Sequence, residues 1–227
     1  MADPDRSQQL LADAIRGALA DAIRSAGRTV RFRAGHVLFV EGDLPERVFI
    51  LEEGWAILSV AGEEGKEVVL GIVGPGDLLG EVSIFDDGTR SATATTLSDL
   101  VATVAPTSTL RDAANDIVLA RGMITILIAR LRNADRQRSE FATVSTPGRV
   151  ARRLLELCER FGEPTPEGLR ITLQLSQEQL ANWCGASREA TVKALSSLRA
   201  RGIVSTSRRS VLITDLAALR RQAYGRV

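Results

Sequence analysis

Between residues 29 and 106 the chain alternates short apolar runs with glycine-containing turns, and this pattern restricts the fold more than any other feature of the sequence. Each run holds only three to six residues, and turns such as Glu53-Gly54 and Gly74-Pro75-Gly76-Asp77 separate the runs. Strands of this length and spacing predict a compact antiparallel barrel or roll. The runs cover residues 30–32, 36–40, 48–51, 55–60, 68–72, 92–96 and 100–104.

Helical periodicity flanks this region on both sides. Residues 8–26 carry an apolar stripe that ends at Gly27. From about residue 108 to residue 145 the helical period returns, and a helix of about 30 residues is ~45 Å long, more than such a roll needs as cover. Its surplus apolar seam predicts a coiled-coil homodimer; the alternative is a helix that packs only on its own roll. The seam residues are Ala120, Ile124, Leu127, Leu131, Ala134, Arg138 and Phe141.

Thr146-Pro147-Gly148 interrupts the helical pattern and predicts a domain boundary. We therefore expect a helix and roll over residues 1–107, a dimerisation helix over residues 108–145 and a further domain over residues 146–227. The last of these contains 14 Lys and Arg against 7 Asp and Glu, a balance of +7, whereas residues 1–145 have a balance of −6. The C-terminal domain is the one expected to bind a polyanion.

The C-terminal domain contains a helix-turn-helix signal. Ser176 with Gln179 forms a capping box that begins one helix. Gly185 supplies a tight turn, and Ser187 is a suitable N-cap for the next helix, which ends at Gly202. Two short helices joined in this way predict a helix-turn-helix.

The second of these helices exposes charged residues at its N-terminal end. Arg188 and Glu189 fall in its first turn, and Lys193 follows about one turn later. Arg and Lys suit guanine O6 and N7, and Glu accepts from the cytosine amino group, so the three side chains fit a major groove. The alternative is a solvated helix face. Beyond it, two strands around a tight turn carry Arg208 and Arg209, a wing that would reach phosphates.

A candidate anion cradle lies within the predicted roll, at residues 76–92. Gly80 allows a ligand close to the backbone, and Arg90, followed by Ser91, offers a planar fork of donors to phosphate oxygens. Glu81 does not suit phosphate, but its carboxylate would accept hydrogen bonds from a sugar hydroxyl. The alternative is a plain loop between two strands.

The sequence disfavours several other classes of protein. No apolar run of about 18 residues is present to span a membrane, and residues 1–6 lack the features of a signal peptide, so we expect a cytoplasmic protein. Cys158 and Cys184 are expected to be reduced thiols in helices. His36 is the only histidine, too few for a cupin-type metal enzyme. We expect neither catalysis nor a bound metal ion.

Several motifs together resemble those of the Crp–Fnr family of bacterial transcription regulators, and are most similar to the actinobacterial cyclic-AMP receptor proteins. The motifs are residues 49–56, 75–81, 90–92, 147–151 and 185–195. The resemblance implies an α+β fold: an N-terminal jelly-roll (β-roll) cyclic-nucleotide-binding domain, a long dimerisation helix and a C-terminal winged helix-turn-helix. It also implies a homodimer that binds a palindromic, TGTGA-like operator in double-stranded DNA and meets RNA polymerase. The cysteine cluster of iron–sulfur members is missing, and only His36 is available for haem.

The resemblance further implies roles for single residues. In cyclic-AMP members a glutamate holds the ribose 2′-hydroxyl while an arginine and a serine hold the cyclic phosphate, roles that fall on Glu81, Arg90 and Ser91. Ala134 and Asp135 take the places of two polar residues that contact adenine. Alanine cannot hydrogen-bond, and aspartate accepts from the adenine amino group or from the N1–H and N2–H edge of guanine, so these two residues leave the base open. The resemblance implies cyclic AMP, and cyclic GMP is the alternative.

The expected sites are therefore two sets of residues. The ligand-binding set is Gly80, Glu81, Val82, Ser83, Arg90, Ser91, Leu131, Ala134 and Asp135, and the DNA-binding set is Ser187, Arg188, Glu189, Lys193, Arg208 and Arg209. We expect a sequence-specific transcription regulator controlled by a cyclic nucleotide. One alternative for Asp135 is that it pairs with an arginine such as Arg132 or Arg138 across the dimer. A separate alternative for the function is a regulator that binds DNA without a ligand.

Overall fold

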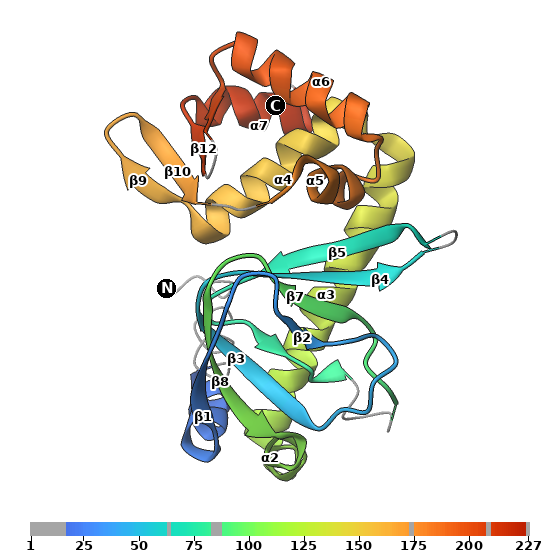
Figure 1. Cartoon of the computed structure of the whole chain (residues 1–227), viewed down its shortest axis with the longest axis vertical. Helices are drawn as coiled ribbons and strands as arrows, with labels where there is room; N and C mark the ends of the chain where they lie inside the picture. Colours follow the sequence, from blue (N-terminus) through green and yellow to red (C-terminus); the bar gives the residue numbers. More distant parts are fainter. Residues whose placement is uncertain (1–16, 63–64, 83–87, 173–174, 208–209, 226–227) are drawn as a thin grey trace, which may run out of the picture. The chain divides into compact units, whose positions relative to one another are not determined.

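The computed structural model describes residues 17–62, 65–82, 88–172, 175–207 and 210–225. Its chain divides into two compact units, one of residues 1–60 and 72–134 and one of residues 61–71 and 135–227. Figure 1 follows the chain in colour and labels its elements.

Residues 28–106 form antiparallel strands, as the pattern of residues 29–106 predicts. Within the described residues the strands form two four-stranded sheets, of order β1-β8-β3-β6 and β2-β7-β4-β5. Each predicted run overlaps a strand, whereas the two-residue strand β6 was not predicted. The strands are β1 (Arg28–Phe32), β2 (Val37–Phe39), β3 (Arg47–Glu53), β4 (Ala56–Ala61), β5 (Glu67–Val73), β6 (Leu78–Leu79), β7 (Thr93–Thr96) and β8 (Leu100–Pro106).

Apolar side chains fill the space on both faces of β3. Leu51 of β3 is buried with Ala56 of β4 and Ala94 of β7, so side chains of both sheets share one core. On the other face, Val48 and Ile50 pack with side chains of the helical residues 17–26, of α2 (Thr107–Ala113) and of α3 (Ile117–Thr143). Because both faces are covered, β3 reads as a continuous apolar run instead of an alternating one.

The helical stretch predicted over residues 108–145 is two helices, α2 and α3. Asp116 separates them, because its side chain accepts hydrogen bonds from the backbone N–H groups of Val118 and Leu119 at 2.8 and 3.0 Å. These bonds satisfy two of the free donors at the start of α3. The apolar periodicity of the sequence continues on both sides of Asp116, so the periodicity alone does not reveal this cap.

The second unit contains a helical domain with a small sheet. Within the described residues its strands have the order β11-β12-β10-β9. The N-cap of α4 is Ser145, so Pro147 and Gly148 form part of its first turn and not a linker, a position where proline loses no hydrogen bond. The elements are α4 (Thr146–Phe161), β9 (Glu163–Thr165), β10 (Gly168–Thr172), α5 (Gln177–Cys184), α6 (Arg188–Ala200), β11 (Val204–Thr206), β12 (Ser210–Ile213) and α7 (Leu216–Tyr224).

Candidate functional site

Gly80 and Arg90 form the centre of the predicted cradle. Gly80 follows β6 with φ of +88°, and a Cβ atom there would lie 2.3 Å from Nη1 of Arg90. The guanidinium donates from Nη1 to the Gly80 carbonyl at 3.1 Å and from Nη2 to the Arg47 carbonyl, and it lies 4.4 Å from the centre of the Phe39 ring. Only glycine therefore leaves room for Arg90 at this turn.

Glu81 is fully buried next to this turn, at 0% exposure. Nη1 of Arg130 on α3 lies 2.6 Å from its Oε1, and Nη2 of the same guanidinium donates to the Leu78 carbonyl at 2.6 Å. The sequence predictions missed Arg130. Its spacing of four residues from Ala134 was a usable signal, because residues four apart lie on one face of a helix.

Burial dominates the electrostatics of the cradle. It raises the pKa of Glu81 above its ordinary value, and the positive charge of Arg130 opposes this effect only in part. Burial likewise lowers the pKa of Arg90, against the opposing carboxylates of Glu81 and Asp43. An arginine stays protonated nonetheless, so the site keeps a buried positive charge.

Three buried polar atoms of the cradle have no hydrogen-bond partner among the described residues. They are both carboxylate oxygens of Glu81 and Nε of Arg90. The short contact between Arg130 and Glu81 is thus an ion pair without hydrogen-bond geometry. Buried polar atoms are almost always paired in proteins, so these acceptors and this donor mark a place where a polar ligand fits.

The structure brings Gly80, Glu81 and Arg90 together. Ser91 is exposed and Val82 is half-buried, while Ser83 lies outside the described residues. Leu131, Ala134 and Asp135 are exposed on α3. Oδ1 of Asp135 lies 3.5 Å from Nη1 of Arg138 in an exposed pair on the same helix.

The predicted helix-turn-helix is present in the second unit. The reciprocal capping box of Ser176 and Gln179 begins α5, and Gly185 ends that helix in the left-handed conformation with φ of +56°. The Ser187 side chain accepts from the backbone N–H of Ala190 at 3.2 Å and so caps α6. These local interactions confirm the predicted helix ends.

Arg188, Glu189 and Lys193 are all exposed on α6. The pKa of Glu189 is lowered by its own backbone N–H and by the Ser187 hydroxyl, so its carboxylate is ionised near neutral pH. Ser187 is exposed as well. The first turn of α6 thus presents an acceptor beside strong donors, which suits the edges of base pairs.

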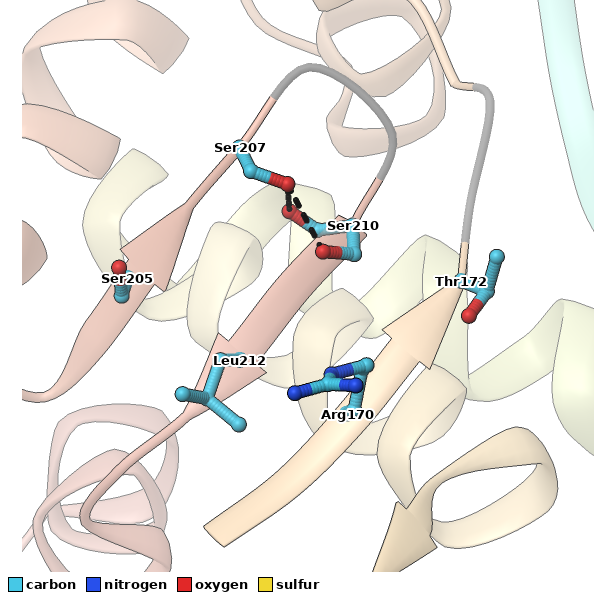
Figure 2. A pocket seen from close by; sticks show the side chains of 6 residues that line it. All are labelled: Arg170, Thr172, Ser205, Ser207, Ser210 and Leu212. Carbon is cyan, nitrogen blue, oxygen red and sulfur yellow. Dashed lines mark hydrogen bonds between the residues drawn. The ribbon is translucent and has the colours of Figure 1, made fainter. Parts of the chain in front are cut away.

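The predicted wing is the antiparallel pair β11 and β12, which β10 and β9 extend into a sheet. Figure 2 shows the side chains of six residues that line a shallow groove of about 440 Å³ on this sheet. Most carry hydroxyl groups, and the Oγ atoms of Ser207 and Ser210 are 2.9 Å apart. Arg208 and Arg209 lie outside the described residues. The lining residues are Arg170, Thr172, Ser205, Ser207, Ser210 and Leu212.

Among the described residues, no helix has the length and apolar character to cross a membrane. In the same part of the chain, no three His, Cys, Asp or Glu side chains come together where they could hold a metal ion.

A β-roll with a buried polar cradle, a long helix and a winged helix-turn-helix define a class of DNA-binding regulators that sense a small ligand. Comparisons with known proteins agree. Residues 29–116 match the model of the cyclic nucleotide-binding domain, and residues 148–222 match that of the Crp-like helix-turn-helix domain. The chain is 37% identical over 195 residues to a CRP-like cAMP-activated global transcriptional regulator of Mycobacterium tuberculosis, covering 86% of this chain and 87% of the relative.

Solved structures show the same architecture. A transcriptional regulator of the CRP family from Thermus thermophilus is 26% identical with a TM-score of 0.72, covering 86% of this chain and 96% of that one. FixK2 from Bradyrhizobium japonicum, at 20% identity, has a TM-score of 0.78 and covers 88% and 99% of the two chains, a likeness of fold alone. The chain belongs to the CRP-like family of transcription regulators. The predicted fold class and the prediction of a DNA-binding regulator instead of an enzyme are confirmed.

Proposed function

We propose that cyclic AMP binds at the cradle of Gly80, Glu81 and Arg90 and controls DNA binding by a dimer of this chain. The observation that carries this proposal is the buried Glu81 carboxylate, whose two oxygens accept no hydrogen bond among the described residues, beside the partnerless Nε of Arg90. A ribose hydroxyl would donate to Glu81. The cyclic phosphate would accept from Arg90 and from the exposed hydroxyl of Ser91, a charge-assisted arrangement.

Fewer residues bear on which base the bound nucleotide carries than on its ribose and phosphate. Ala134 has no polar side-chain atom, and the Asp135 carboxylate offers acceptors only, so the helix would accept from the adenine amino group. The N1–H and N2–H edge of guanine suits the same carboxylate, which makes cyclic GMP the competing ligand. The M. tuberculosis relative is cAMP-activated by name, and this favours cyclic AMP.

The dimer would form along α3. Ile117, Ile124, Ile128 and Leu131 are exposed on this helix at 77%, 54%, 43% and 61%, an unusual concentration of exposed apolar side chains. Their spacing of seven, four and three residues is that of a coiled-coil seam. A second copy of α3 would remove these side chains from water, which is favourable in proportion to the apolar area buried.

On DNA, each α6 of the dimer would read one half of a palindromic, TGTGA-like operator. Arg188, Glu189 and Lys193 would contact base edges, while Ser187 and the wing with Arg208 and Arg209 would contact phosphates. The ligand would favour the form of the dimer in which the two α6 helices lie about one DNA turn apart. We place this regulator in the cytoplasm, where it would meet RNA polymerase.

Calorimetric titration of cyclic AMP and cyclic GMP into the full-length protein tests the ligand. We expect heat with cyclic AMP, and its loss in Arg90→Ala. Arg31→Ala, at an exposed arginine of β1, is the matched control and should bind as the wild type does. Heat with cyclic GMP but none with cyclic AMP would identify cyclic GMP as the ligand. No heat with either nucleotide would overturn the proposal.

Fluorescence anisotropy with palindromic and scrambled duplexes tests the DNA contacts. Arg188→Ala should abolish the preference for the palindrome, because the guanidinium contacts bases, whereas Arg208→Ala should weaken both duplexes alike. An equal loss of affinity on both duplexes in both variants would refute this division of roles.

One observation favours a second function, a regulator that binds DNA without a ligand. Arg130 already neutralises Glu81, and two nitrogens of Arg90 already donate to backbone carbonyls. If the protein binds DNA without a ligand, added nucleotide would change neither its DNA affinity nor its melting temperature.

A further inference from the structure

Arg149, in the first turns of α4, is buried at 9% exposure and makes an unusual set of contacts. Nε donates to the Cys184 carbonyl at 2.7 Å, and Nη2 donates to the Gly185 carbonyl at 3.1 Å. Nη1 donates to the Val144 carbonyl at 2.5 Å, and Nη2 also lies 3.3 Å from the Thr146 hydroxyl. A single guanidinium therefore joins three backbone carbonyls from two separate segments.

These carbonyls belong to the ends of two helices. Cys184 is the last residue of α5 and Gly185 is its C-cap, while Val144 directly follows α3. Carbonyls at a helix C-terminus lack partners within the helix and form the negative end of its dipole. The planar guanidinium, with five donors and a permanent charge, caps both ends at once, which the single ammonium group of a lysine cannot do.

Phe141 of α3 reaches the same turn. A Cβ atom on Gly185 would lie 2.8 Å from Cε1 of Phe141, so the ring lies against the glycine, and the Arg149 guanidinium is 5.9 Å from the ring centre. Gly185 stands two residues before Ser187, the N-cap of α6. The end of α3 thus contacts the turn that determines where the DNA-reading helix begins.

We propose that Arg149 is a positioning residue that couples the end of α3 to the orientation of α6. A change in α3 near Val144 alters the carbonyl that Arg149 holds, and the same guanidinium holds the turn before α6. The part of this inference that concerns cyclic AMP rests on the proposed function. The part that concerns the orientation of α6 on DNA does not need a ligand.

The test compares Arg149→Gln and Arg149→Lys with the wild type. Arg160→Gln changes an exposed arginine on the same helix and is the matched control. Nucleotide affinity is measured by calorimetry with cyclic AMP, DNA affinity by anisotropy on palindromic and scrambled duplexes with and without cyclic AMP, and folding by circular dichroism and urea unfolding.

In Arg149→Gln we expect affinity for cyclic AMP within about twofold of the wild type, since the cradle is untouched. Affinity for the palindrome should fall by roughly tenfold, while affinity for the scrambled duplex changes by less than about threefold. The gain in DNA affinity on adding cyclic AMP should shrink toward one. The affinity of Arg149→Lys for the palindrome should lie between those of the wild type and Arg149→Gln, because lysine keeps the charge but loses the fork of donors.

A purely structural role would lower the free energy of unfolding and affect both duplexes equally, and that result overturns the proposal. So does an unchanged palindrome preference in a folded Arg149→Gln protein. If Arg149→Gln does not fold, Arg149→Lys supplies the comparison, because lysine keeps the positive charge at this buried position but loses the fork of donors. If neither the wild type nor Arg160→Gln binds cyclic AMP or changes its DNA affinity on adding it, the proposed function fails. The ratio of the affinities for the palindromic and scrambled duplexes still decides the role of Arg149.

Discussion

Arg130, on the long helix, lies 2.6 Å from the carboxylate of Glu81, which directly follows the β-roll turn at Gly80. Through this contact a residue of α3 neutralises the buried acid of the cradle. The same guanidinium donates to the Leu78 carbonyl, so its position is defined at two points. A hydroxyl that donates to Glu81 would compete with Arg130 for the carboxylate.

Removal of this cation should destabilise the protein. In Arg130→Gln the buried carboxylate loses its charged partner, and because Arg130 is itself 35% exposed we expect a loss of about 1–3 kcal/mol in the free energy of unfolding. Urea denaturation at pH 7 measures it, with Arg132→Gln as the control at an exposed arginine of the same helix. Addition of Glu81→Gln should restore most of the loss; a double variant no more stable than Arg130→Gln contradicts the pairing.

Stability should depend on pH through Glu81. Because burial raises the folded-state pKa of Glu81, the native protein holds this proton at pH values where the unfolded chain has released it. The contribution of the protonated acid to the free energy of unfolding is fully present below the unfolded-state pKa of about 4.3. It is lost as pH rises through the raised folded-state pKa.

Urea denaturation of the wild type and Glu81→Gln across this pH range measures the effect. The difference in unfolding free energy should shift in favour of the glutamine variant as pH rises. Glu52, whose pKa is lowered by the hydrogen bond from Arg24, gives the opposite slope in both proteins and cancels in the comparison. A difference that does not change with pH would contradict the raised pKa.

Gly80→Ala should impair the cradle more than Gly76→Ala does. Both glycines have positive φ, +88° and +85°, so alanine strains the backbone at either position by roughly 1–2 kcal/mol. Only at Gly80 does the new Cβ meet Arg90, at 2.3 Å, whereas nothing lies within 4 Å at Gly76.

Calorimetry with cyclic AMP should therefore show an affinity about tenfold or more weaker in Gly80→Ala, equivalent to about 1.4 kcal/mol, and near wild type in Gly76→Ala. Equal affinities in the two variants would mean that the place of Arg90 next to Gly80 is unimportant for the ligand.

Ile124→Glu should prevent association of the proposed dimer. Ile124 is 54% exposed on α3, so a carboxylate there is tolerated in the isolated chain but would place two like charges in the seam. Size-exclusion chromatography with light scattering should give the monomer mass for Ile124→Glu and the dimer mass for Ala129→Glu, an exposed residue on another face of α3. A dimer in both variants would place the interface elsewhere.

Most secondary structure of this chain follows from local sequence. The strands of the roll are recognisable because glycine turns separate short apolar runs, and the ends of α5 and α6 because Ser176, Gln179, Gly185 and Ser187 act on backbone groups within a few residues. The break between α2 and α3 was missed, since the cap of Asp116 lies inside a continuing helical period.

The residue types of the cradle were also visible in the sequence, as a glycine and a carboxylate followed by an arginine. Sequence by itself determined this local chemistry, because turns, caps and periodicity act between near neighbours. Only the tertiary structure decided that Arg130 neutralises Glu81 from 49 residues away, that Gly80 must lack a Cβ for Arg90 to fit, and that Arg149 joins the ends of two helices. These contacts arise when packing removes distant polar groups from water together, and their partners are set by the packed arrangement and not by spacing along the chain.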